Sequence, residues 1–283
     1  MAAPAERATV TNGPSRAAHT CSPRLEGPLV NGVRIDPVTP EEFLRVVDSF
    51  LSCGRSHVAH FCSAHPTTEA RGDRAYRDLL NRGDLNLPDG AAVAWASRLA
   101  GTPAKRLSGT EGFRAVVHGG TARGLRHYLY GGSPEALELL QRKLRTEEPG
   151  IVIAGAESPP YRPLSDEEVA EAAARMRAAD ADAVWVGLGA PKQDLMAARL
   201  RDLEAAPAIF CVGAAFDFVA GTVNRAPRWM QRSGLEWLHR LLSDPRRLWR
   251  RYLIGNPRFV AGVVSDRLRG RTRFHPGPES DRA

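Results

Sequence analysis

The sequence has few lysines, few cysteines and no long apolar run. Lysine supplies only three of the 39 cationic side chains, so arginine carries the basic character of the chain. The four cysteines (Cys21, Cys53, Cys62 and Cys211) include no CxxC pair, which excludes a zinc ribbon or a thioredoxin motif and favours a reduced cytosolic setting. No apolar run approaches the roughly 18 residues that a spanning helix needs, and the N-terminal segment lacks the hydrophobic stretch of a signal peptide. We therefore expect neither a membrane span nor a signal peptide.

Several ligand-binding motifs are missing as well. The eight histidines are dispersed, and no HxxxH, HxH or DxD arrangement stands at the end of a predicted strand, so we expect no metal site. There is no Walker A motif. Gly187-Leu188-Gly189-Ala190-Pro191-Lys192 has a lysine where the third glycine of a GxGxxG dinucleotide motif would stand. We therefore predict no cofactor. Of the functions considered for this chain, a Rossmann-type oxidoreductase has the least support in the sequence.

Charge is distributed unevenly along the chain. The content of 43% hydrophobic and 25% charged residues is ordinary for a globular protein. Residues 225–273 carry 13 arginines against three acids, whereas residues 25–224 have a net charge of −4. Such a segment could bind nucleic acid or an anionic membrane. Its interleaved Trp237, Trp249 and Tyr252 favour an amphipathic helix at a membrane surface, and nucleic-acid binding is the runner-up.

The order of predicted elements indicates an α/β fold. Asn31-Gly32 predicts a hairpin within Leu29–Asp36. Predicted strands then cover His57–Cys62, Asp84–Pro88, Arg126–Tyr130, Ile151–Ala154, Ala183–Val186 and Ala208–Val212. Predicted helices cover Thr39–Ser52, Pro66–Asn81, the stretch from Gly90 to Arg98, Ser133–Glu147, Ser165–Ala179 and a segment from Lys192. This alternation is typical of a Rossmann-like, mostly parallel sheet with helices on both faces.

Four segments follow from this pattern. We expect a disordered leader (1–24), an α/β catalytic domain (25–234), an amphipathic, arginine-rich helical appendage (235–269) and a disordered tail (270–283). Within the appendage, Pro245 is expected to divide two helices, because proline interrupts a helix.

Candidate site residues follow the predicted strands, because ligands of an open parallel sheet bind beyond the carboxyl ends of its strands. Three of these turns are glycine-bearing and lead into a helix, which suits a phosphate group. Asp89 follows a strand directly and is our candidate general base. Asp217 is the competing carboxylate, with a structural role as its alternative, and Lys192 and Gln193 start a helix from which they could reach a ligand.

A set of motifs in a fixed order resembles the WecG/TagA/CpsF glycosyltransferases (glycosyltransferase family 26) from about Val30 to Phe259. The motifs are Pro88-Asp89-Gly90, Arg106-Leu107-Ser108-Gly109-Thr110, Tyr130-Gly131-Gly132, Gly187 to Asp194, Gly213 to Asp217, Ala220-Gly221, Arg225 to Trp229, Gly234 to Arg240 and Asp244 to Tyr252.

The resemblance implies an inverting, metal-independent enzyme that moves a sugar, N-acetylmannosamine or another hexose, from a UDP-sugar to a polyprenyl-diphosphate-linked acceptor at the cytoplasmic membrane face. It implies that Asp89 is the base, that Gln193 contacts substrate and that arginines of the appendage close over the diphosphate. We assign Arg225, Arg246 and Arg250 to that last role. Self-association is also implied. Teichoic acid, capsule, exopolysaccharide and specialised-metabolite glycosylation all stay open as pathways.

One turn departs from the family pattern. The family usually has Thr-x-Asn-Pro after the second strand, lining the sugar pocket, and this chain has Ser63-Ala64-His65-Pro66. The histidine changes the size, charge and hydrogen bonding of the turn, and it is either a sugar contact, a second acid/base or a packed turn residue. The substrate-binding residues that we predict are Ser63, His65, Gly90, Arg106, Gly109, Gly131, Gly132, Gly187, Gly189, Lys192, Gln193, Gly213 and Asp217.

Overall fold

The computed structural model describes residues 27–273, apart from the side chains of Arg228 and Arg232. The predicted leader (1–24) lies outside the described residues, as does the part of the predicted tail from residue 274 onward. A parallel sheet with the strand order β4-β3-β8-β7-β5-β6 forms the centre of the molecule. Its strands are β3 (His57–Cys62), β4 (Leu85–Pro88), β5 (Arg126–Gly131), β6 (Val152–Glu157), β7 (Ala183–Gly187) and β8 (Ala208–Cys211).

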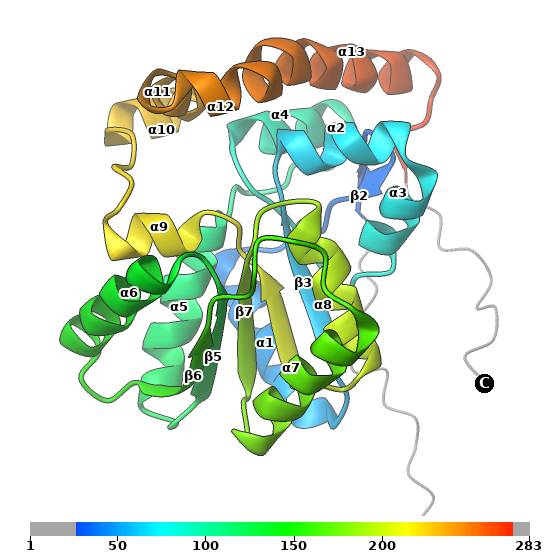
Figure 1. Cartoon of the computed structure of the whole chain (residues 1–283). Coiled ribbons are helices and arrows are strands. Elements are labelled where there is room, and N and C mark those ends of the chain that lie inside the picture. Colours follow the sequence, from blue (N-terminus) through cyan, green and yellow to red (C-terminus); the bar gives the residue numbers. More distant parts are fainter. Residues whose placement is uncertain (1–26, 274–283) are drawn as a thin grey trace, which may run out of the picture.

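Helices cover both faces of the sheet, which confirms the predicted fold class (Figure 1). One face packs against α1 (Pro40–Cys53), α5 (Gly109–Thr121), α6 (Pro134–Glu147) and α9 (Ala215–Ala220). The other face packs against α7 (Asp166–Ala178) and α8 (Lys192–Asp202). In the first layer the Trp185 and Phe210 rings stack with centroids 4.3 Å apart, and Phe113 meets Trp185 edge-on at 4.7 Å. These buried aromatic contacts fix the strands that carry the site.

Local signals in the sequence explain the first elements. The hairpin is present as β1 (Leu29–Val30) and β2 (Val33–Arg34), with Asn31 and Gly32 at φ 53° and 82° between them. Both turn residues need the left-handed region, which Asn and Gly adopt most readily. The predicted helix start at Thr39 is a capping box, because the Thr39 hydroxyl accepts from the Glu42 N–H at 3.2 Å and Glu42 accepts from the Thr39 N–H at 2.7 Å.

Two helical regions differ from the prediction. The single helix predicted over 66–81 is two helices, α2 (Ala64–Gly72) and α3 (Arg74–Asn81). The break lies at Asp73, whose extended backbone lets its carboxylate accept from the Tyr76 N–H at 3.1 Å and cap α3. After α4 (Ala91–Leu99) the chain forms α5, which was not predicted, although Ser108 and Glu111 form a second capping box at its start.

The arginine-rich segment is helical and lies across the end of the molecule where the strands end (Figure 1). It contains α10 (Arg228–Ser233), α11 (Glu236–Ser243), α12 (Pro245–Trp249), a π-helical turn (Arg250–Ile254) and α13 (Gly255–Leu268). Pro245 separates α11 from the uninterrupted helical stretch of α12, the π-helical turn and α13, so the two predicted helices are confirmed; α10 and the π-helical turn were not predicted. Between residues 27 and 273, no helix combines the length and the apolar content needed to cross a membrane.

The last helix, α13, is anchored on the body of the protein. Phe259 and Val263 are buried in a hydrophobic cluster that contains Val33, Tyr76 and Leu80. An ion pair joins Arg71 Nη1 of α2 to Asp266 Oδ2 at 2.6 Å, and beyond the helix the Leu29 N–H donates to the Thr272 carbonyl at 2.9 Å. The appendage is therefore part of the folded core and covers the carboxyl edge of the sheet.

Truncating Phe259 tests this anchoring. We expect Phe259→Ala to lower the free energy of unfolding by about 3–5 kcal/mol, because it removes a fully buried aromatic ring and leaves a cavity. Val260→Ala, one residue along on the exposed face of α13, should change it by less than about 0.5 kcal/mol. Urea unfolding followed by circular dichroism measures both, and equal effects would show that α13 does not contribute to the core.

Candidate functional site

Asp89 lies at the carboxyl end of β4, between Pro88 and Gly90. Gly90 has a φ of 93°, a conformation that suits glycine and turns the chain sharply into α4. The Asp89 N–H donates to the Cys62 carbonyl at the end of β3 at 3.0 Å, which ties the turn to the neighbouring strand. The residue is half-buried. Two adjacent strands therefore hold this carboxylate at the edge of the sheet where a parallel α/β fold binds its ligands.

The surroundings of Asp89 raise its pKa to about 7. Burial is the largest cause, since it disfavours the charged form, and the carboxylates of Glu236 and Glu111 add to it. The guanidinium groups of Arg106 and Arg240 act in the opposite direction. Near neutral pH the carboxylate can therefore both accept and release a proton, which is the property expected of a general base.

Two arginines and two glutamates form an ion-pair network beside Asp89. Arg106 lies 2.8 Å from Glu111 and 3.5 Å from Glu236, measured between its Nη atoms and the carboxylate oxygens. Arg225 lies 3.5 Å and 3.6 Å from the same two carboxylates, and its Nη2 donates to the Ser108 hydroxyl at 3.2 Å. Because Glu111 starts α5 and Glu236 starts α11, this network joins the body to the appendage at the site.

Arg251 of the π-helical turn also faces this site. Burial lowers the pKa of its guanidinium, and the nearby Asp89 carboxylate partly offsets that effect. The pKa of His65 is lowered to about 4, mainly by burial and further by the Arg251 charge. His65 is therefore neutral at neutral pH. The structure thus brings together His65, Asp89 and Arg251 from the ends of two strands and from the appendage.

The arginines assigned to the diphosphate from the sequence do not occupy the same position as Arg251. Arg246 and Arg250 are exposed on the outer side of the appendage, where the Arg250 guanidinium lies 5.2 Å from the centroid of the Trp249 ring. Their role at the diphosphate stays a prediction. Arg225 lies in the ion-pair network described above.

Gln193 joins two of the predicted binding turns. Its side-chain oxygen accepts from the Gly189 N–H at 3.1 Å and from the Gly213 N–H at 2.9 Å, and the residue is buried. These hydrogen bonds hold the turns after β7 and β8 together. Gln193 thus has a structural role in addition to the predicted substrate contact, which stays a prediction.

Close backbone approaches explain other glycines of the predicted site. A Cβ on Gly131 would lie 2.7 Å from the Gly187 carbonyl, and one on Gly109 would lie 2.8 Å from the Val212 carbonyl. Packing therefore demands glycine at these positions whether or not they bind a ligand. Gly132 follows Gly131 at the end of β5 with a φ of 76°.

The remaining polar candidates lie around the same edge. Ser63 precedes α2, and its hydroxyl makes no capping hydrogen bond. Lys192 is exposed, with its Nζ 4.2 Å from the centroid of the Tyr161 ring, and Asp217 is partly exposed in the first turn of α9. Their substrate contacts stay predictions.

A buried polar cluster lies behind the site. Asp194 accepts hydrogen bonds from the Tyr76 hydroxyl at 2.6 Å and pairs with His60 Nδ1 at 2.8 Å. His60, Asp194 and Cys211 offer donor atoms within 4.8 Å of one another, a spacing that could hold a metal ion. Both Asp194 oxygens already take part in hydrogen bonds to protein groups, so the cluster has a structural explanation in stabilising the start of α8.

Replacing Glu236 should change the pH dependence of the reaction. In Glu236→Gln, the loss of the like charge lowers the pKa of Asp89, so the acidic limb of the kcat/KM profile moves to lower pH. The ordinary profile should rise with pH through about 7. Glu138→Gln, an exposed change on α6, is the control and should leave the profile in place. An unchanged profile in Glu236→Gln would contradict the assignment of this limb to Asp89.

Four residues at the site were not predicted from the sequence: Glu111, Glu236, Arg240 and Arg251. The Ser108-x-x-Glu111 spacing is a capping-box signal that could have revealed α5 and with it the position of Glu111. The other three residues lie in motifs of the resemblance, but which of several adjacent arginines faces inward depends on the π-helical turn. Nothing in the sequence predicted that turn.

Comparison with known proteins adds independent information. The family model for the "Glycosyl transferase WecG/TagA/CpsF family" matches residues 29–273. A Bacillus subtilis protein named N-acetylglucosaminyldiphosphoundecaprenol N-acetyl-beta-D-mannosaminyltransferase is 32% identical over 210 residues, covering 74% of this chain and 79% of that protein. A Bacillus spizizenii protein of the same name is 29% identical over 257 residues, covering 86% of this chain and 97% of that protein. The family match runs through the arginine-rich segment, which is therefore part of the family's own unit.

Proposed function

Since the chain belongs to the WecG/TagA/CpsF family of glycosyl transferases, we propose that it transfers a hexose from a UDP-sugar to a polyprenyl-diphosphate-linked sugar in the synthesis of a cell-surface polysaccharide. The names of the two Bacillus relatives support N-acetylmannosamine as the sugar moved and a diphosphoundecaprenol-linked N-acetylglucosamine as the acceptor. The observation that carries the proposal is Asp89, a carboxylate with a pKa of about 7 at the ligand edge of the sheet, beneath the arginines of the appendage.

The proposed reaction is a single displacement with inversion. The acceptor hydroxyl attacks the anomeric carbon of the donor while Asp89 takes the hydroxyl proton. The new glycosidic C–O bond forms as the bond between that carbon and the UDP oxygen breaks, and UDP leaves with the electron pair. Base catalysis of this kind contributes about 10²–10⁴-fold to a rate, and orientation of the two substrates contributes further.

The leaving UDP needs positive charge around its diphosphate. Arg240 and Arg251 are arginines of the appendage that interact electrostatically with Asp89, and they suit this role. Guanidinium groups bind phosphate oxygens through paired, charge-assisted hydrogen bonds. We assign them the neutralisation of the leaving group in a reaction that proceeds without a metal ion.

His65 is assigned a contact with a sugar. A pKa of about 4 leaves its imidazole neutral at neutral pH, so it can both donate and accept a hydrogen bond there. That state suits a sugar hydroxyl better than a role as proton donor. With the Ser63 hydroxyl, it replaces the Thr and Asn of the usual family turn, so these two residues are the place where sugar preference would differ.

The outer face of the appendage is assigned to the membrane. Arg246, Arg250 and Trp249 are exposed there. Arginine is attracted to anionic headgroups, and tryptophan favours the depth of the headgroups. These exposed residues support the proposal that the protein acts at the inner face of the cell membrane, where a lipid-linked acceptor would meet it. Flotation with anionic vesicles that weakens as salt increases is the expected behaviour.

A substrate screen tests the proposal. Thermal unfolding is followed with a panel of UDP-sugars, each with and without EDTA, and stabilisation by one UDP-sugar that is insensitive to EDTA is expected. That sugar is then tested for transfer to N-acetylglucosamine diphosphate carrying a short lipid tail. Loss of stabilisation and transfer with EDTA would refute metal independence, and the absence of transfer from any UDP-sugar would refute the donor class.

A further inference from the structure

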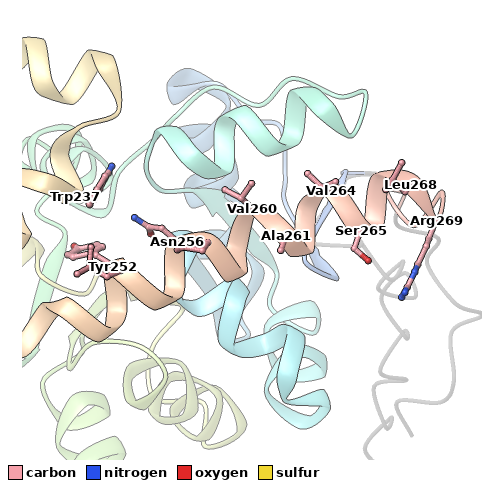
Figure 2. A pocket seen from close by; sticks show the side chains of 11 residues that line it. Trp237, Tyr252, Asn256, Val260, Ala261, Val264, Ser265, Leu268 and Arg269 are labelled. Carbon is pink, nitrogen blue, oxygen red and sulfur yellow. The ribbon is translucent and has the colours of Figure 1, made fainter.

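An apolar groove of about 890 Å³ runs along α13, on the side away from the hydrophobic core. Figure 2 shows its lining, from Trp237 and Tyr252 at one end to Leu268 and Arg269 at the other. Leu253, Val260, Val264 and Leu268 line it and are 56%, 45%, 45% and 82% exposed. Exposed apolar residues that gather in one hollow indicate a binding surface more often than isolated ones do.

The helix therefore has two apolar sides. Phe259 and Val263 on one side pack into the core, whereas Val260 and Val264, each the next residue along, line the groove. A helix that is apolar on opposite sides normally has a partner on both. The second partner is not supplied by residues 27–273.

The groove begins next to the site. Glu236 and Arg251 interact electrostatically with Asp89. The residue that follows each of them, Trp237 and Tyr252 respectively, lines the end of the groove. The rings of Trp237 and Tyr252 lie 6.0 Å apart between centroids. A ligand held at Asp89 can thus extend past these rings along α13.

The chemistry of the two regions identifies the ligand class. The site end offers guanidinium groups, Arg251 and Arg240, that attract a diphosphate, and the groove offers aliphatic and aromatic side chains. A molecule that matches both has an anionic head and a long apolar tail. A volume of about 890 Å³ also falls in the range of small-molecule sites, roughly 300–1,000 Å³, whereas a helix that rests on a bilayer needs no hollow.

We propose that the groove along α13 binds the polyprenyl chain of the acceptor. This proposal rests on the proposed function. The proximal part of the chain lies between Tyr252 and Leu268 while the diphosphate meets the arginines at the site. The 14 residues of α13 span about 21 Å, so the groove holds the first isoprene units and leaves the rest of the chain to the membrane.

Binding of two prenyl diphosphates to the full-length protein tests the proposal. Heptaprenyl diphosphate and geranyl diphosphate share the head and differ only in tail length, and calorimetry in one detergent buffer gives both dissociation constants. We expect the longer compound to bind at least tenfold more tightly. In the double variant Val260→Ser with Val264→Ser this preference should fall below threefold, because both changes place hydroxyls in the groove without touching the core.

Leu242→Ser is the matched control. Leu242 is a 72% exposed apolar residue on α11 of the same appendage and lies outside the groove, so this variant should keep the full preference for the longer tail. Leu268→Ser, at the far end of the groove, gives a second groove variant should the double variant unfold, and it should also reduce the preference. A wild-type protein without any preference, or groove variants that retain it, would overturn the proposal.

Two further measurements distinguish the prenyl chain from a lipid bilayer or a second copy of the chain as the occupant of the groove. The double variant should still float with anionic vesicles that contain no prenyl lipid, and it should keep the oligomeric state of the wild type in light scattering. Loss of flotation would show that the groove face docks on the bilayer, and a change of oligomeric state would show a second copy of the chain there. Either result replaces the prenyl chain as occupant.

The proposed function is read out separately. Transfer from a UDP-sugar to an acceptor with a short tail is measured in the wild type and in Leu242→Ser, which lies outside the groove and should retain it within about twofold of the wild type. If the wild type transfers a sugar to this acceptor but binds the two prenyl diphosphates equally well, the groove proposal is wrong and the proposed function stands. If the wild type binds the longer prenyl diphosphate more tightly but transfers no sugar to any acceptor, the proposed function is wrong and the groove proposal stands.

Discussion

Asp89→Asn should lower turnover at least a hundredfold while UDP still binds. The amide has nearly the shape of the carboxylate but cannot accept a proton, so the variant loses base catalysis, which contributes about 10²–10⁴-fold. Binding of UDP should persist, because the arginines assigned to the diphosphate come from the appendage. Steady-state turnover and calorimetry of UDP binding measure the two effects on the same preparation. Retained turnover would remove Asp89 as the base.

The same variant should be more stable than the wild type in alkaline solution. The pKa of Asp89 is raised from an ordinary 3.8 to about 7 in the folded protein, so ionisation destabilises the folded state as the pH rises through this interval. Above pH 7, Asp89→Asn should therefore raise the free energy of unfolding by up to about 4 kcal/mol. The difference should disappear below about pH 4, where the carboxyl is protonated in both states.

Asp48→Asn serves as the control for both measurements. Asp48 is an exposed carboxylate on α1, so its replacement should leave turnover and the pH dependence of stability unchanged. If Asp89→Asn instead loses stability at every pH, its low turnover reflects damage to the fold and carries no information on the base.

Arg251→Ala should have the second largest effect, a decrease in kcat/KM of about 10²-fold, comparable to the loss of one preorganised group that stabilises transition-state charge. Arg251 is half-buried and interacts electrostatically with Asp89, whereas its neighbour Arg250 is exposed. Both residues share the π-helical turn, so truncating either one changes the local helix similarly. Arg250→Ala should therefore lower kcat/KM much less than Arg251→Ala.

The pair of variants separates the two assignments of the diphosphate ligand. A larger loss in Arg250→Ala than in Arg251→Ala would favour the assignment made from the sequence. The pKa of His65 is an additional readout. The Arg251 charge lowers this pKa, so removing that charge should raise it. The His65 resonance, followed by NMR, should titrate at higher pH in Arg251→Ala than in the wild type and should be unaffected in Arg250→Ala.

Much of the fold could be predicted from local signals. The Asn31-Gly32 turn, the capping box at Thr39 and the buried runs such as Ala208–Cys211 each determine their element within a few residues. The break at Asp73 was not predicted, although Gly72 at the end of α2 and Asp73 as the N-cap of α3 are typical signals of such a break. The start of α5 was missed because its glycines obscure a helical pattern.

The candidate site was only partly predictable. The carboxyl ends of parallel strands lie at one edge, so the positions of Asp89, His65 and Gly213 followed from the order of elements. The pairing of Arg106 and Arg225 with Glu111 and Glu236 did not follow, because it depends on how the appendage folds back on the body. Long-range packing of that kind leaves no periodic pattern in the sequence.

The bridge between Pro28 and Arg273 joins positions that are far apart in the sequence. On the ribosome the first hairpin emerges before the sheet, but its hydrogen-bonding partner at Thr272 is translated only after every strand of the sheet. The appendage itself follows all six strands of the sheet, so Asp89 stays uncovered on the nascent polypeptide until the appendage has emerged. Closure of the site is thus late relative to synthesis of the sheet, and its rate depends on contacts of long sequence separation.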